Sequence, residues 1–131
     1  MLLAVHAWQL YLKKMRIKVG VTDVDAYGIV HHPMYLVWCE KAVTEYICTV
    51  NLRDFNKEIP GKITGMNLKF QHMAQLYEEL CVQVKSGKKI KDDLWKFPVS
   101  IMRITDHSLI MGGELFIGFG KEEGACRSGT F

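Results

Sequence analysis

A short segment near the start of the chain, Thr22–Tyr35, combines the residue types that acyl-transfer chemistry requires. It holds two carboxylates, Asp23 and Asp25, followed by a glycine and by the sequence His31-His32-Pro33, which opens a stretch with helical spacing. A carboxylate beside a helix N-terminus lies next to backbone N–H groups that have no partner within the helix. One group can then make or assist a nucleophilic attack while the N–H groups hold the oxyanion that forms.

Each of these residues also has a purely structural interpretation. Aspartate is favoured in turns and at helix N-caps, so the residue types alone leave Asp25 open between a cap and a catalytic group. Asp23 is interpreted as structural, paired with a basic residue or with a loop N–H. His31 and His32 are adjacent and point in different directions at a helix start, whereas two metal ligands on a helix are usually four residues apart. The sequence therefore predicts no metal site at this pair of histidines.

The elements that position the segment follow from the spacing of apolar residues. Before it, apolar and polar residues alternate over Met15–Val21, which predicts a half-buried strand. After it, an apolar stripe predicts a long amphipathic helix over about Pro33–Asn51. The polar stretch Leu52–Gly61 then predicts a connection. The stripe consists of Tyr35, Trp38, Cys39, Ala42, Val43, Tyr46, Ile47 and Val50.

Four more strands are expected in the second half of the chain. The alternation of apolar residues predicts the first three at Met66–Gln71, Leu80–Lys85 and Phe97–Met102. The fourth is a longer apolar strand at Leu109–Phe119, in which Gly112-Gly113 predicts a bulge. Short connections favour antiparallel pairing, and one helix packed on one sheet makes a two-layer α+β domain.

Composition and charge are those of an ordinary soluble globular protein. The chain has 131 residues, of which 49% are hydrophobic and 24% charged, and its formal net charge is +3. This length predicts a single domain over residues 1–131, with a flexible glycine-rich tail over 121–131. The charge is too small to favour nucleic acid as a partner.

The first residues of the chain and its cysteines indicate the cellular compartment in which the protein is expected. The apolar run Met1–Leu10 has no preceding basic residues and is too short to span a bilayer, so neither a signal peptide nor a membrane partner is expected. Met15 is an alternative start, with residues 1–14 as an upstream extension. The four cysteines form no CxxC pair, which favours a reduced, cytoplasmic protein without disulfides or a zinc site.

The sequence from Asp23 to Tyr35, with Trp38 and Glu40 further along, resembles the motif of the 4-hydroxybenzoyl-CoA thioesterase family. The order of the expected elements matches that family's hot-dog fold, in which a curved antiparallel sheet wraps one long central helix. The resemblance extends from about Arg16 to about Gly120, although beyond the helix only the strand pattern supports it. It implies an acyl-CoA thioester hydrolase that requires no metal or redox cofactor.

The resemblance also assigns roles to individual residues. Asp25 matches the family's catalytic carboxylate, which acts as nucleophile or as general base. His32 matches the position whose backbone N–H polarises the thioester carbonyl, and Gly28 matches the glycine that lets the loop turn close to the helix. Tyr27 lies in the same loop and is expected to border the acyl pocket. Glu40 is the reserve candidate for the carboxylate and, with Asp25 in that role, is interpreted as a buried or interface residue.

A cluster of lysines has two interpretations. Lys88, Lys89 and Lys91 lie in a lysine-rich segment, and such a segment is usually a solvated hairpin. Because the resemblance implies a coenzyme A thioester as substrate, the same lysines are candidate ligands of its phosphates. The neighbouring Asp92-Asp93 pair dilutes their charge.

Two other functions are open at this point. A hot-dog domain can hold an acyl-CoA or acyl-carrier thioester without cleaving it, and a hot-dog dehydratase acts on 3-hydroxyacyl thioesters. Dehydration requires a paired acid and base, usually a histidine and a carboxylate on different segments, which the Asp-x-Asp-x-x-Gly arrangement fits less well. Relatives in the family pair edge to edge, so a homodimer or homotetramer with the site between subunits is expected. The acyl group, and the choice between coenzyme A and a carrier protein, stay open.

Overall fold

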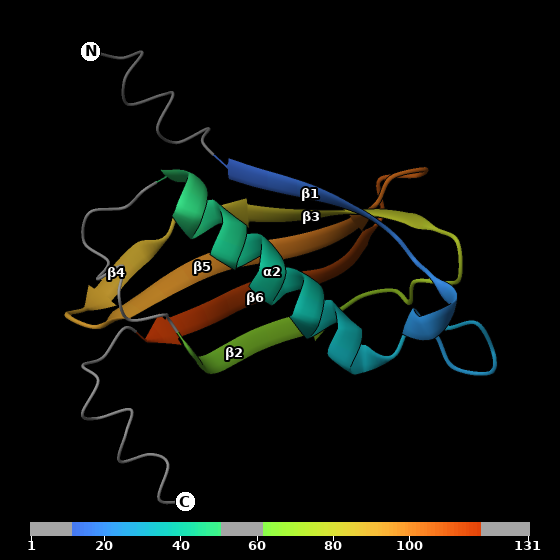
Figure 1. Ribbon diagram of the computed structural model, residues 1–131, viewed down its shortest axis with the longest axis horizontal. Coiled ribbons are helices and arrows are strands. Elements are labelled where there is room, and N and C mark those ends of the chain that lie inside the picture. Colours follow the sequence, from blue (N-terminus) through green and yellow to red (C-terminus); the bar gives the residue numbers. More distant parts are fainter. Residues whose placement is uncertain (1–11, 51–61, 119–131) are drawn as a thin grey trace, which may run out of the picture.

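One long helix lies across one face of an antiparallel sheet in the computed structural model of the protein, which describes residues 12–50 and 62–118 (Figure 1). The chain order is strand, short 3-10 helix, long helix and then five strands. The elements are β1 (Leu12–Lys18), η1 (Val21–Asp23), α2 (His32–Val50), β2 (Lys62–Phe70), β3 (Glu79–Lys85), β4 (Lys88–Lys91), β5 (Leu94–Arg103) and β6 (Leu109–Gly118).

The sheet has the strand order β1-β3-β5-β6-β2, with the short β4 paired to β5 beside this path. Every pairing is antiparallel. These features confirm the predicted α+β class and the hot-dog arrangement of a sheet around a central helix. Because β2 is at one end of the strand order, its outer edge has no neighbouring strand in the described part of the chain.

The core forms between α2 and the sheet, as the helical stripe predicted. Six residues of that stripe are buried, and the strands opposite contribute alternating buried side chains that begin with Leu80 on β3 and Phe97 on β5. Each large apolar side chain that leaves water in this way stabilises the fold by about 1.5–3 kcal/mol. The six helix residues are Tyr35, Trp38, Cys39, Ala42, Val43 and Tyr46.

The first strand lies three residues earlier than predicted. It begins at Leu12 and ends at Lys18, so residues 12–14 belong to the sheet and pair with β3. After it, the N–H of Gly20 donates to Asp23 Oδ2 at 2.8 Å, and this contact turns the chain into η1. Val21 therefore lies in η1 and is exposed, although its spacing placed it on the buried face of a strand.

Two features of the later strands also differ from the prediction. Gly112 and Gly113 hold regular register with both neighbouring strands, so no bulge occurs there; shifts lie instead at Ile63/Gly65 and Ile101/Met102. At Gly113 a Cβ would collide with the backbone carbonyl of Asn67, so glycine allows β2 to approach β6 closely. The short strand β4 was not predicted, because its four residues are all exposed and show no alternation of apolar and polar residues.

Some of the expectations fall outside the described residues. These are the remainder of the upstream extension 1–14, the connection Leu52–Gly61 and the tail 121–131. Of the four cysteines, the structure describes Cys39 and Cys81 as free thiols. Among residues 12–50 and 62–118, no helix has both the length and the apolar character needed to cross a membrane.

Candidate active site

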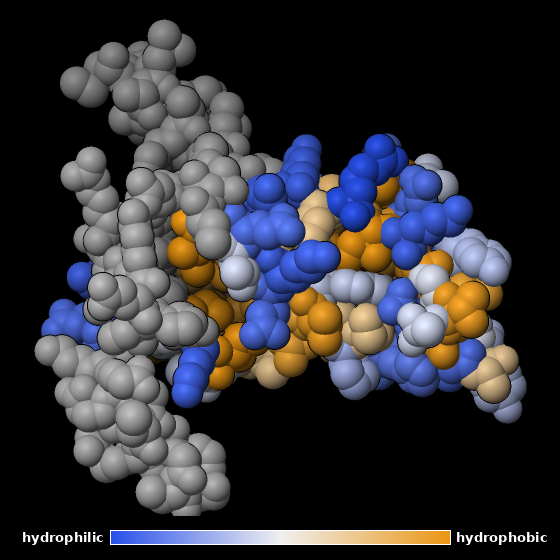
Figure 2. Space-filling view, viewed as in Figure 1, coloured by the Kyte–Doolittle hydropathy of each residue, from blue (hydrophilic) through white to orange (hydrophobic). Residues whose placement is uncertain are grey.

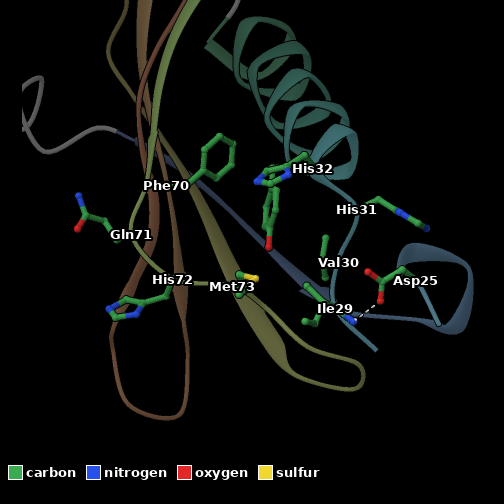
Figure 3. A pocket seen from close by; sticks show the side chains of 10 residues that line it. Asp25, Ile29, Val30, His31, His32, Phe70, Gln71, His72 and Met73 are labelled. Carbon is green, nitrogen blue, oxygen red and sulfur yellow. Dashed lines mark hydrogen bonds between the residues drawn. The ribbon is translucent and has the colours of Figure 1, made fainter. Parts of the chain in front are cut away.

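The side chain of Asp25 accepts hydrogen bonds from the backbone of the turn in which it lies. Its Oδ1 accepts the backbone N–H groups of Tyr27, at 2.8 Å, and of Ile29, at 3.1 Å (Figure 3). The main chain of Asp25 adds two bonds, since its N–H donates to the Ile29 carbonyl and its carbonyl accepts the N–H of Gly28, both at 2.9 Å. The second carboxylate oxygen, Oδ2, accepts no hydrogen bond from the residues that the structure describes. One oxygen therefore builds the turn while the other is available for chemistry.

Gly28 supplies the backbone conformation that this turn requires. Its φ of 77° lies in the left-handed region, where a residue with a Cβ is strained. The carbonyl of Gly28 accepts the N–H of Leu76 at 2.9 Å, and the N–H of Val30 donates to the Ala74 carbonyl at 3.0 Å. The turn is thus laid against the segment that follows β2, in agreement with a role for Gly28 in shaping the loop.

Asp23 has the structural role that was expected of it. Besides the bond to the Gly20 N–H, its backbone carbonyl accepts the N–H of His31 at 3.0 Å. Asp23 is not among the residues that line the cleft described below. The prediction that it pairs with a loop N–H is confirmed, and the pairing fixes the direction in which the chain enters α2.

The N-terminus of α2 presents an unpaired donor. The helix begins at His32, and the N–H of Met34 already bonds to the His31 carbonyl at 3.0 Å. Pro33 has no N–H. The N–H of His32 has no acceptor among the described residues, so it is available to a ligand. It also lies at the positive end of the helix dipole, which favours negative charge.

A cleft of about 570 Å³ brings these two groups to one place (Figure 3). One wall is aromatic: the ring centroids of His32 and Phe70 lie 4.8 Å apart in an edge-on arrangement, and those of Tyr35 and Phe70 lie 5.4 Å apart. The cavity therefore combines a carboxylate and a helix N-terminus with an apolar surface. Its lining consists of Asp25, Ile29, Val30, His31, His32, Tyr35, Phe70, Gln71, His72 and Met73.

Tyr35 ties the two sides of the cleft together. It is buried, and its hydroxyl accepts the N–H of Ala74 at 3.0 Å. Burial raises the pKa of this hydroxyl, so Tyr35 stays protonated and neutral near physiological pH. Its contribution to the cleft is to fix the segment after β2 against the first turn of α2.

Three expected groups of residues are not brought to the cleft. Tyr27 donates its backbone N–H to Asp25 Oδ1, but its side chain is 88% exposed at the tip of the turn and does not line the cavity. Glu40 is exposed rather than buried and lies beyond the lining residues of α2. Tyr27 therefore does not border the cleft of its own chain, and Glu40 is not buried within it, while the interpretation of Glu40 as an interface residue stays a prediction.

The lysines lie on β4, which pairs with the start of β5. Lys89 pairs with Trp95 near the start of β5. Phe70, at the cleft end of β2, pairs with Met111 on β6, and Met111 pairs with Ile101 near the end of β5. At about 3.3 Å per residue, the two places are roughly 20 Å apart along β5. In Figure 1, β4 and the turn that follows η1 occupy opposite ends of the molecule. The structure therefore does not bring Lys88, Lys89 or Lys91 to the cleft of their own chain.

Four lining residues lie outside the segment Thr22–Tyr35, from which the site was predicted: Phe70, Gln71, His72 and Met73. They lie at the end of β2 and in the loop that follows it. A change from strand alternation to the sequence Gln71-His72-Met73 marks the end of a strand, but it does not say which element the loop reaches. Within the described residues, no three His, Cys, Asp or Glu side chains come together so as to hold a metal ion.

Sequence comparison finds similarity to thioesterases over part of the chain. The sequence model of the Thioesterase superfamily matches residues 27–88. The acyl-CoA thioesterase YbgC of Helicobacter pylori is 32% identical over 78 residues, which cover 58% of this chain and 59% of the relative. The match thus spans less than two thirds of that relative's length.

Solved structures show the same fold. A probable thioesterase from Bartonella henselae superimposes with a TM-score of 0.72 at 19% identity, covering 86% of this chain and 92% of that one. The 4-hydroxybenzoyl-CoA thioesterase from Pseudomonas sp. strain CBS-3 superimposes with a TM-score of 0.73 at 22% identity, covering 82% and 84%. The chain therefore has the fold of the hot-dog thioesterases, and over residues 27–88 its sequence is similar to the Thioesterase superfamily.

Proposed function

We propose that the protein hydrolyses acyl-CoA thioesters in the cleft at the N-terminus of α2. The observation that supports this proposal most directly is the pairing of the unbonded Asp25 Oδ2 with the unbonded N–H of His32 around one cavity. The relative from Helicobacter pylori is named an acyl-CoA thioesterase, which gives the class of substrate. A bound thioester would direct its carbonyl oxygen at the helix N-terminus and its acyl group along the aromatic wall.

The N–H of His32 stabilises the charge that develops during the reaction. When the carbonyl carbon becomes tetrahedral, its oxygen gains negative charge next to this N–H and to the positive end of the helix dipole. A donor of this kind is fixed before the reaction starts, and removing one costs about 3 kcal/mol in the barrier of a well-studied protease. The imidazole of His32 is not needed for this role, because the donor belongs to the backbone.

Asp25 supplies the attack on the carbonyl carbon. Its Oδ2 either bonds to that carbon, giving an acyl anhydride, or takes a proton from a water molecule that attacks. In both routes a C–O bond replaces the C–S bond, and the thiolate leaves and takes up a proton. In the first route a water molecule then hydrolyses the anhydride, which releases the carboxylate product and restores Asp25. The net reaction consumes the thioester and one water and gives a carboxylate, the free thiol and a proton.

The activity is tested by release of free thiol from a panel of acyl-CoAs with aromatic, short branched and long acyl groups. The proposed reaction uses a carboxylate, water and backbone N–H groups, so we expect turnover to be unchanged after dialysis against EDTA. Binding of an acyl-CoA without thiol release would favour the non-catalytic alternative. Loss of turnover in EDTA, restored by a divalent cation, would contradict the cofactor-free mechanism.

We also propose that two copies of the chain assemble through the edge of the sheet at β2. This strand has no outer neighbour among the described residues, and its Met66 and Phe70 are 49% and 43% exposed. On the face that carries α2, hydrophobic patches alternate with hydrophilic ones (Figure 2). An unprotected strand edge with apolar side chains favours association. Since Phe70 lines the cleft, such an assembly would put the cleft at the subunit interface.

The compartment that fits these features is the cytoplasm. Cys39 and Cys81 are free thiols, which are stable in a reducing environment. Burial raises the pKa of the Cys39 thiol to about 12, so it stays protonated and chemically inert in the folded protein.

A further inference from the structure

Arg103 is the last residue of β5, and its guanidinium joins two loops at one end of the sheet. Its Nη1 donates to Ser108 Oγ at 2.8 Å and to Asp106 Oδ2 at 3.2 Å, both in the turn between β5 and β6. Hydrogen bonds from Ser108, with help from Arg103, lower the pKa of Asp106 to about 2, so this partner stays charged. The arginine is therefore anchored firmly on the β5–β6 side.

The other edge of the guanidinium holds the segment between β2 and β3. Nη2 donates to the backbone carbonyl of Met73 at 3.0 Å, and Nε forms an ion pair with Glu78 Oε2 at 3.0 Å. Glu78 in turn accepts the N–H of Gln75 through Oε1 at 2.9 Å. The side chain of Arg103 is only 18% exposed, and that of its partner Glu78 is 27% exposed. Arg103 thus fixes both ends of residues 73–78.

The Asp25 turn rests on the same segment. Between the two ends held by Arg103, the Ala74 carbonyl accepts the N–H of Val30 and the N–H of Leu76 donates to the Gly28 carbonyl. An isolated bridge also pairs Ile29 with Gln75. Ala74 additionally bonds to the Tyr35 hydroxyl on α2. The hydrogen bonds of segment 73–78 therefore fix the position of the Asp25 turn relative to the N-terminus of α2.

We propose that Arg103 is a positioning residue for the reaction: by clamping segment 73–78 it holds Asp25 at the correct place relative to the His32 N–H. This inference rests on the proposed function for its catalytic consequence. Arginine fits the task because its planar guanidinium has several N–H donors in a fixed fork: the two Nη atoms donate to Met73, Asp106 and Ser108, while Nε forms the ion pair with Glu78. Lysine keeps the charge but cannot span these partners at once.

The test compares Arg103→Lys with Arg16→Lys. Arg16 makes a matched control because it also pairs with a glutamate, Glu79 at 3.1 Å, but its side chain is 71% exposed and its partner belongs to β3 and not to segment 73–78. For Arg103→Lys we expect kcat to fall about 10- to 100-fold while KM changes little, as for a misplaced reacting group. Arg16→Lys should keep the wild-type kcat. Both are assayed well below their midpoint of thermal unfolding.

A second readout does not depend on activity. Amide hydrogen exchange at Val30 and Leu76 reports the two backbone hydrogen bonds between the Asp25 turn and segment 73–78. The exchange rates at these two amides should rise in Arg103→Lys but not in Arg16→Lys. A folded Arg103→Lys variant with wild-type kcat and wild-type exchange would overturn the inference. If Asp25→Asn keeps full turnover, the proposed function fails instead, while the exchange data still decide the positional claim.

A milder variant covers the case in which Arg103→Lys does not fold. Glu78→Gln removes the charge of the ion pair but leaves a side-chain oxygen for the Gln75 N–H. We expect a smaller fall in kcat than for Arg103→Lys, with faster exchange at Leu76. Wild-type kcat and wild-type exchange in this variant would overturn the inference as well.

Discussion

At the scale of single residues, Asp25 combines a structural role with the chemical role that we propose for it. Its Oδ1 caps the turn through the N–H groups of Tyr27 and Ile29, while Oδ2 is unbonded within the described residues and borders the cleft. The motif predicted which aspartate would face the site and which would support the loop. It did not predict that Tyr27 points away, because the direction of a side chain at a loop tip depends on which neighbours are hydrogen bonded.

Gly28 offers a test of the turn itself. Gly28→Ala should strain the left-handed backbone by about 1–2 kcal/mol and lower turnover, because the turn carries Asp25. A Cβ at this position meets only Leu76 Cβ at 3.9 Å, so the effect comes from conformation and not from crowding. Gly28→Asn should lose less, since asparagine tolerates this region better. Denaturant unfolding and kcat measure both, and equal values for Gly28→Ala and the wild type would contradict the account.

At the scale of elements, periodicity predicted which residues face the core but not which elements meet. The stripe of α2 and the alternation along β3 and β5 depend on local spacing, so sequence reasoning could find them. The wall formed by the end of β2 depends on the strand order β5-β6-β2, which places Phe70 beside the first turn of α2. The spacing of residues in the sequence does not indicate this strand order. The same holds for Arg103, whose partners lie on two separate loops.

Two adjacent glycines on β6 give a prediction for the sheet. Gly113→Ala should destabilise the fold by about 1–3 kcal/mol, because its Cβ would collide with the Asn67 carbonyl and push β2 away from β6. Gly112→Ala is the matched control: its Cβ would make only ordinary contact with Leu109, at 3.7 Å, and alanine lowers the entropy of the unfolded chain. Thermal or urea unfolding compares them. Equal stabilities would contradict the close approach of the two strands.

At the scale of the whole molecule, the fold separates the lysines of β4 from the cleft at the N-terminus of α2. The lysines of β4 lie at one end of the sheet and the Asp25 turn at the other (Figure 1). The sequence could not show this separation, because it follows from the register of β4 on the start of β5. A monomer also leaves the edge of β2 without a neighbouring strand in the described part of the chain.

The assembly through β2 is tested by light scattering. We expect a molar mass of at least twice the 15.0 kDa of the chain. Met66→Glu should shift the mass toward that of the monomer, because it adds charge to the exposed apolar side of β2. Ile90→Glu is the comparison variant, at an exposed apolar residue of β4, which pairs with β5 and not with β2, and it should leave the mass unchanged. A wild-type protein that stays monomeric at high concentration would contradict the proposed interface.

The central claim is that Asp25 carries out thioester hydrolysis at the N-terminus of α2, and its most direct test is the kcat of Asp25→Asn beside that of Asp23→Asn. In both variants the asparagine oxygen can accept the same loop N–H groups, so the free energy of unfolding should change little. We predict that Asp25→Asn lowers kcat by about 10²- to 10⁴-fold, while Asp23→Asn keeps turnover close to the wild type. A folded Asp25→Asn protein that hydrolyses acyl-CoA at the wild-type rate would contradict the account.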